Sequence, residues 1–82
     1  MTLADEIRAF VHQNYFEPAR RRGEHEITIR AGDVHSAMKL VGRMPAVCSA
    51  LGTDKFQKEY RVRLVRREGP HLGANLRLTF EL

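Results

Sequence analysis

The sequence predicts an α+β fold in which helices pack against a small antiparallel sheet. Apolar residues recur every three or four positions near the amino terminus and again in the middle of the chain, which is the spacing of amphipathic helices. Apolar and polar residues alternate over residues 25–31 and 75–82, which is the spacing of strands. The 82 residues are enough for one domain, and we expect that domain to span residues 1–82.

The first helix is predicted to begin at Thr2, with Asp5 completing a capping box. It is expected to run to about Phe16. Pro18 could end it, or residues 19–22 could add a further turn. Its buried face consists of apolar residues at helical spacing, namely Leu3, Ile7, Phe10, Val11 and Tyr15.

Residues 25–31 are predicted to form a strand, with Ile27 and Ile29 on one face. Two short helices joined by a tight connection are expected next. Asp33 is a good N-cap for the first of them, and Gly42 is suited to end it. The second helix is expected from about Met44 to Leu51, because Pro45 fits the first turn of a helix.

The remaining residues predict a helical segment and a hairpin. Thr53 or Asp54 can cap the segment DKFQKEY, which either continues the preceding helix or stands alone. Residues 61–67 and 75–82 then form an antiparallel pair of strands across a loop rich in glycine. The predicted core is shared by Ile7, Phe10, Val11, Ile29, Val34, Met38, Val47, Leu51, Leu64, Leu78 and Phe80.

The charge of the chain favours a polyanionic partner. The formal net charge is +4, and 11 of the 14 basic residues are arginine. Arginine is better suited than lysine to bidentate contacts with phosphate and guanine. An arginine-rich proteome would explain the ratio equally well, but it would not explain where the charges lie.

Residues that would support catalysis, metal binding or a membrane location are not evident. The histidines share no metal-ligand spacing with each other or with Cys48, and no nucleophile motif occurs. We therefore expect no enzyme activity, no metal and no cofactor. No apolar run reaches membrane-spanning length, and a single cysteine fits a reducing compartment, so we expect a cytoplasmic protein without membrane contact.

The element order resembles that of the winged helix-turn-helix superfamily. The predicted order is helix, strand, helix, helix, strand, strand, in which DVHSAMKL, a glycine turn and a helix rich in small residues precede the hairpin. The resemblance implies a winged-helix fold that binds double-stranded DNA, as a transcription regulator or targeting module. The helix at about 44–51 would enter the major groove, and the wing, residues 66–77, would contact the backbone or the minor groove.

The resemblance and the charge pattern together give the candidate nucleic-acid contacts. Those around the second helix and the wing are Arg43, Ala46, Ser49, Thr53, Lys55, Arg66, Arg67, His71 and Arg77. Further candidates for phosphate contacts are Arg20, Arg21, Arg22, Arg61 and Arg63, which could equally be solvated surface residues.

Two other functions remain open at this point, because a fold does not determine what it binds. The first is a winged helix that docks on a protein partner, either alone or as part of a larger chain. The second is a winged helix that binds RNA.

Overall fold

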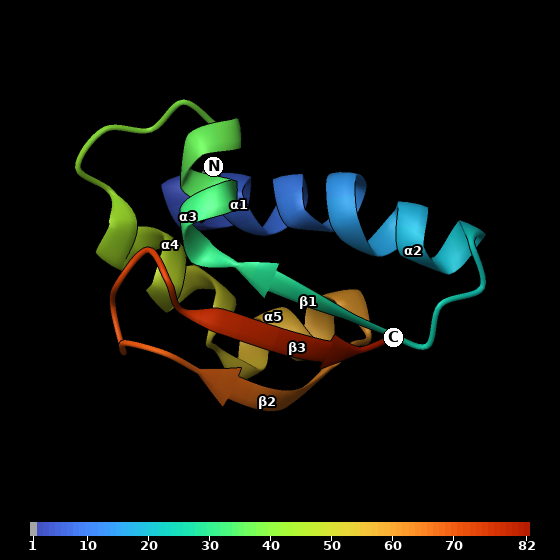
Figure 1. Cartoon of the computed structure of the whole chain (residues 1–82). Helices are drawn as coiled ribbons and strands as arrows, with labels where there is room; N and C mark the ends of the chain where they lie inside the picture. Colours follow the sequence, from blue (N-terminus) through green and yellow to red (C-terminus); the bar gives the residue numbers. More distant parts are fainter. Residues whose placement is uncertain (1) are drawn as a thin grey trace.

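Helices cover one face of a three-stranded antiparallel sheet in the computed structural model, which describes residues 2–82 (Figure 1). The predicted α+β class and the small antiparallel sheet are confirmed. The strand order is β1-β3-β2. The elements are α1 (Leu3–Val11), the π-helical turn η1 (His12–Phe16), α2 (Glu17–Arg21), β1 (Glu26–Arg30), α3 (Ala31–Ala37), α4 (Met44–Leu51), α5 (Asp54–Tyr60), β2 (Arg63–Glu68) and β3 (Arg77–Glu81).

The first helix begins as predicted and continues past Phe16. Thr2 Oγ1 accepts a hydrogen bond from the backbone N–H of Asp5, whose carboxylate accepts one from Thr2, so the capping box is confirmed. The helix does not end at Pro18. The wider turn of η1, in which the N–H of Glu17 donates to the carbonyl of His12, comes directly before the proline. Such a turn relieves the clash that a proline ring makes with the preceding helical turn.

The predicted start of the third helix at Asp33 is wrong. The N-cap is Arg30, three residues earlier, and the backbone N–H groups of Ala31 and Gly32 donate to carbonyls of the β2–β3 loop and need no side-chain cap. The Asp33 carboxylate instead accepts a bond of 2.8 Å from the Arg30 guanidinium.

The predicted end of this helix at Gly42 is also wrong. Lys39 adopts a left-handed conformation with φ of 57°, which ends the helical path after Ala37. Val41 therefore lies outside the helix and is 88% exposed. The segment 38–43 forms a loop rather than the last turn of a helix.

α4 has the predicted bounds, and α5 is a separate helix. Pro45 occupies the first turn of α4, and Gly52 follows its last residue. Thr53 is the N-cap of α5, because its hydroxyl accepts a hydrogen bond of 3.3 Å from the N–H of Phe56. Arg61 ends α5 in a left-handed conformation, so the predicted strand start at residue 61 is wrong by two positions.

A β-bulge in β2 reverses which face of the sheet the residues after it occupy. Leu64 is opposite Phe80, but the next paired residue is Arg66, opposite Thr79, so Val65 is the extra residue. Arg66 therefore shares the outer face of the sheet with Thr79, while Arg67, opposite Leu78, is turned to the inner face that carries the core.

The centre of the core is a cluster of three phenylalanine rings. The ring centroids of Phe16, Phe56 and Phe80 lie 5.3 to 5.5 Å apart, and all three side chains are fully buried. The predicted core omits Phe16. Its members are buried except for the half-buried Phe10, Met38 and Leu64.

Candidate nucleic-acid interface

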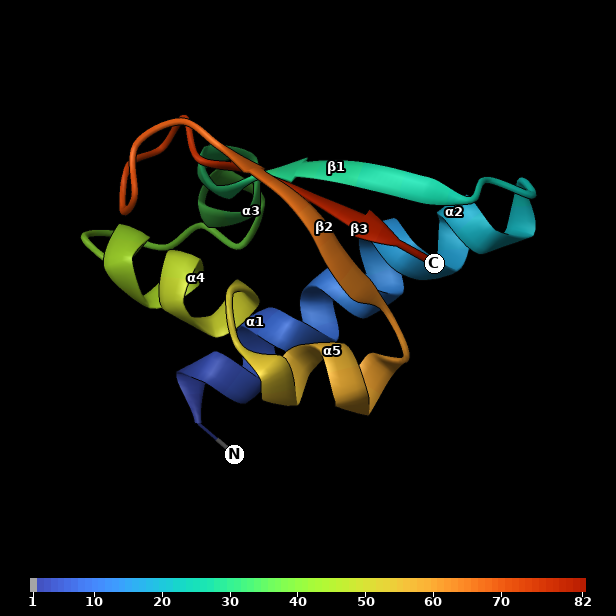
Figure 2. The same ribbon diagram turned by 90° about the horizontal axis from the view of Figure 1, so that it is seen from below.

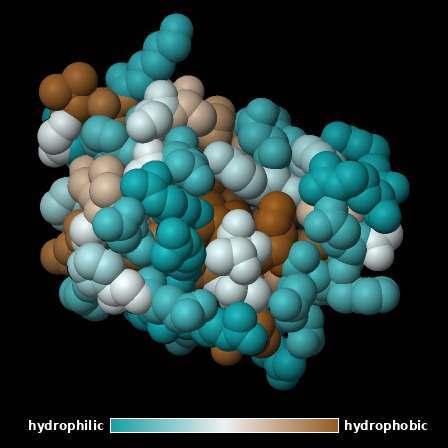
Figure 3. Space-filling view, viewed as in Figure 1, coloured by the Kyte–Doolittle hydropathy of each residue, from teal (hydrophilic) through white to brown (hydrophobic). Residues whose placement is uncertain are grey.

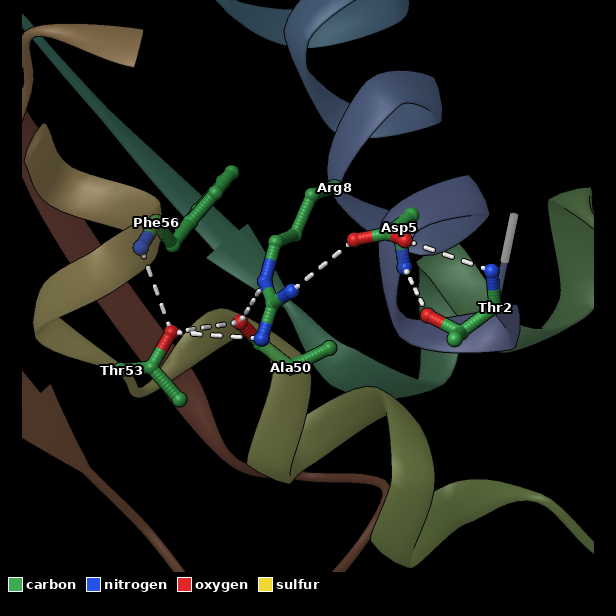
Figure 4. Close-up of polar contacts among 6 residues, drawn as sticks. All are labelled: Thr2, Asp5, Arg8, Ala50, Thr53 and Phe56. Carbon is green, nitrogen blue, oxygen red and sulfur yellow. Dashed lines mark hydrogen bonds and ion pairs between the residues drawn. The ribbon is translucent and has the colours of Figure 1, made fainter. Parts of the chain in front are cut away.

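The carboxyl end of α4 is fixed to α1 by a buried arginine. Arg8 is 8% exposed, and its Nε donates to the carbonyl of Ala50 at 3.1 Å (Figure 4). Its other nitrogens contact Thr53 Oγ1 at 3.5 Å and Asp5 Oδ1 at 3.4 Å. Because these bonds join α1 to the end of α4 and the start of α5, they set the position of both helices.

The loop between β2 and β3, residues 69–76, lies against the other side of α4. Cys48 Sγ lies 3.9 Å from the carbonyl of Gly73, and the same loop accepts the backbone bonds from the start of α3 (Figure 2). Burial raises the pKa of the Cys48 thiol, so it remains a protonated donor near neutral pH. At the base of the loop Gly69 has φ of +92°, and a Cβ there would lie 2.5 Å from the carbonyl oxygen of Asn75. The loop is therefore held at three places: Gly69 packs against Asn75, the carbonyl of Gly73 contacts Cys48, and the carbonyls of Ala74 and Leu76 bind the start of α3.

Arg43 lies at the amino end of α4. Its backbone N–H donates to His35 Nε2 at 3.2 Å, which ties the preceding loop to α3. The Arg43 side chain is exposed and makes no hydrogen bond or ion pair with any of residues 2–82.

Arg67 lies at the carboxyl end of α4. A Cβ added to Gly52 would meet Arg67 Nη2 at 3.4 Å, so the guanidinium lies beside the last turn of the helix. A cation is favourable there, because the helix end carries unpaired carbonyl groups. The eight residues of α4 rise about 12 Å, so Arg43 and Arg67 bracket a surface of about that length.

The exposed stripe of α4 between these arginines is narrower than predicted. Pro45 and Ser49 are exposed, whereas Ala46 and Thr53 are half-buried. The Thr53 hydroxyl caps α5 and contacts Arg8. Cys48 and the apolar face of the helix are buried against the loop and the core.

Two segments without carboxylates meet around α4. Residues 34–53 and 69–80 are the longest stretches of the sequence that contain neither Asp nor Glu. The Cys48–Gly73 contact brings them together. Lys39 and Arg43 in the first segment and His71 in the second are exposed. The surface around α4 thus combines basic side chains from chain segments that contribute no opposing charge.

Other predicted contacts lie on the outer face of the sheet. The register places Arg63 opposite Glu81, and their side chains are joined at 3.1 Å. Arg77 is opposite Glu68 on the same face. Arg66 has no ion-pair partner among the described residues, but the acidic side chains around it make this face mixed in charge.

Arg20, Arg21 and Arg22, the predicted phosphate contacts in α2 and the residue after it, lie away from α4. Arg20 donates to the backbone carbonyls of Tyr60 and Arg61, and Arg22 pairs with Glu24. These residues belong to the end of the molecule where α2 lies, opposite α4 in Figure 1. Arg21 is exposed at that same end, and Lys55 is exposed on α5. The structure does not bring the three arginines at residues 20–22 to the surface around α4.

Arg8 was not among the predicted site residues. The sequence does contain an indication of its burial. Arg8 follows Ala4 by four residues and precedes Val11 by three, so it lies on the buried side of α1. An arginine on an apolar stripe has to find buried acceptors, and in this chain the Ala50 carbonyl is one.

Comparisons of the chain with protein-family models, curated proteins and solved structures gave no match. Within residues 2–82, no helix is long and apolar enough to cross a membrane. The same part of the chain contains no group of three or more His, Cys, Asp or Glu side chains that could hold a metal ion.

Proposed function

We propose that this chain is a double-stranded DNA-binding module of the winged helix-turn-helix class. α4 enters the major groove, and the β2–β3 hairpin is the wing. The order of α1, β1, α3, α4, β2 and β3 and the placement of β3 between the other two strands support this assignment. α5 is an additional helix between the recognition helix and the wing.

The observation that carries the proposal is the surface around α4, where two carboxylate-free segments meet between Arg43 and Arg67. Neutralisation of phosphates by arginine and lysine supplies most of the affinity in non-specific DNA binding. The major groove is about 12 Å wide and admits an α-helix, whose diameter with side chains is about 10–12 Å. Cations at both ends of α4 therefore suit the phosphates that border the groove.

The side chains divide into two roles. Arg67 and His71 are placed for backbone phosphates, which position a protein without reading sequence. Arg43 is the candidate for a bidentate contact with guanine, because it stands at the start of the helix and its guanidinium is free of other bonds within residues 2–82. Ser49 is the one exposed hydroxyl on the stripe of α4 and can bond a base edge or a phosphate.

A protein partner is the rival function, and one observation favours it. Val41 and Leu72, which are 88% and 45% exposed, lie in the loops on either side of α4. Apolar side chains that flank a smooth helix are typical of protein-docking surfaces as well. The test therefore has to distinguish phosphate binding from apolar contact.

The decisive test is duplex binding as a function of salt with two matched variants. The wild-type chain is expected to bind a short duplex at about 50 mM salt and to lose affinity steeply towards 200 mM. Arg67→Ala is expected to reduce the slope of log affinity against log salt by about 1, because one phosphate contact is lost. Arg66→Ala removes the same side chain from the neighbouring residue on the outer face and is expected to leave the slope unchanged.

Fluorescence anisotropy of a labelled duplex measures all three proteins under the same conditions. No duplex binding by the wild-type chain at low salt would favour the protein-docking function. A reduced slope for Arg66→Ala with an unchanged slope for Arg67→Ala would mean that the outer face of the sheet, rather than α4, binds the nucleic acid. A preference for single-stranded RNA over duplex DNA would favour the RNA-binding alternative.

A further inference from the structure

An apolar groove lies between α1 and the segment that follows α3. Its volume is about 470 Å³. One wall is a stripe of α1 at helical spacing, and the other wall is the segment that follows α3. The lining residues are Leu3, Glu6, Ala9, Phe10, Gln13, Met38 and Leu40.

The most exposed large apolar side chain of the described chain stands next to this groove. Val41 is 88% exposed, and it follows Leu40, which lines the groove. Lys39 and Gly42 have positive φ values of 57° and 64°, so the loop turns on both sides of Val41 and holds it outward. Figure 3 shows hydrophobic atoms at the upper left of the molecule, where this loop lies in Figure 1. Leu40 lines the groove, whereas Val41 is not among the lining residues. Val41 therefore does not fill the groove of its own chain.

The groove and the loop are complementary in charge. Glu6 is the one charged residue that lines the groove, and its side chain is exposed. The loop carries Lys39 two residues before Val41 and Arg43 two residues after it. An apolar tip with basic neighbours therefore matches an apolar groove with an acidic rim.

We infer that the chain forms a symmetric dimer in which Val41 of each copy enters the groove of the other copy. A surface patch that contains both a projection and its complementary groove is self-complementary, and a two-fold axis closes such a contact. Lys39 of one copy then lies near Glu6 of the second copy, and the reverse contact forms across the axis.

The dimer and the proposed DNA-binding surface share the loop before α4. The dimer does not rest on the DNA binding, because it is argued from Val41, Glu6 and the groove, and none of these has been assigned a contact with DNA. The dimer would also affect how the chain binds DNA. Val41 lies three residues before α4, so the two α4 helices of the dimer would be close to the two-fold axis. Dimeric helix-turn-helix proteins use this symmetry to bind two half-sites.

Sedimentation equilibrium from micromolar to near-millimolar concentration tests the dimer. The wild-type chain is expected to reach twice the mass of one chain. Val41→Lys is expected to weaken the dimer by about 30-fold or more, the effect of losing an anchor side chain at the centre of an interface. Val65→Lys is the matched control, because Val65 is 42% exposed at the bulge of β2 and takes no part in the groove or the loop. It is expected to dimerise like the wild type.

A charge exchange tests the pairing of the two surfaces. Glu6→Lys and Lys39→Glu are each expected to weaken the dimer by roughly fivefold, and the double variant is expected to recover the loss. Circular dichroism shows whether each variant is folded. A wild-type chain that keeps the mass of a single copy at near-millimolar concentration would overturn the inference. A folded Val41→Lys variant that dimerises as tightly as the wild type would overturn it too, as would a double variant no tighter than either single one.

Discussion

Replacement of Phe56 by alanine is expected to lower the free energy of unfolding by about 3–5 kcal/mol. The Phe56 ring is fully buried and lies 5.5 Å from the rings of Phe16, Phe80 and Tyr60. Truncation removes the contacts that join α5 to the helix that contains η1 and to β3, and it leaves a cavity. A loss of this size is a large share of the stability of a small domain, which is commonly about 5–15 kcal/mol.

Urea unfolding followed by circular dichroism measures this loss. Leu72→Ala is the control, because Leu72 is 45% exposed in the β2–β3 loop and its truncation is expected to change stability by no more than about 0.5 kcal/mol. A loss below about 1 kcal/mol for Phe56→Ala would contradict the aromatic core described above.

Replacement of Arg8 by methionine is expected to cost about 2–3 kcal/mol of stability. Methionine keeps much of the packing of the arginine stem, so the loss reports on the polar contacts. The bond to the Ala50 carbonyl, at 3.1 Å, is buried, and a hydrogen bond from a charged group is worth about 1.5–3 kcal/mol. The contact with Thr53 Oγ1, at 3.5 Å, is longer and adds less.

Arg21→Met is the matched control for this variant. Arg21 lies in α2 of the same continuous helical segment, is exposed and has no hydrogen-bond partner within residues 2–82. Its replacement is expected to change the stability by less than about 0.5 kcal/mol. Equal urea midpoints for the two variants would show that Arg8 does not join α4 to α1.

The fold class and most helix and strand positions could be predicted because local patterns determine them. The alternation of apolar residues around Leu78 and Phe80 defines β3, and Thr53 and Pro45 mark the starts of α5 and α4. The wrong start of α3 arose where contacts distant in sequence override the local pattern, whereas the left-handed residues Lys39 and Arg61 displaced the end of α3 and the start of β2. Asp33 has the chemistry of an N-cap, but the loop after β2 satisfies the first N–H groups of α3 and Arg30 binds the carboxylate.

The candidate site could be predicted less well than the fold. Arg66 and Arg67 are consecutive, and nothing in the sequence distinguishes them. The bulge at Val65 reverses their facing, so Arg67 lies beside α4 and Arg66 lies on the outer face. A bulge depends on the pairing of two strands, which the local sequence of one strand does not reveal. Likewise, the long-range contact of Arg20 with the end of α5 removes it from the exposed basic residues.

Nuclear magnetic resonance mapping of a duplex on the folded chain shows directly whether the surface around α4 binds DNA. Backbone amide signals are followed while a short duplex is added at low salt. We expect shifts concentrated in residues 43–53 and 69–76 and at Arg67, with small changes in β1 and α2. Shifts concentrated in β1 and α2 would contradict binding at the surface around α4. The absence of any shift with the duplex in excess at low salt would contradict DNA binding altogether.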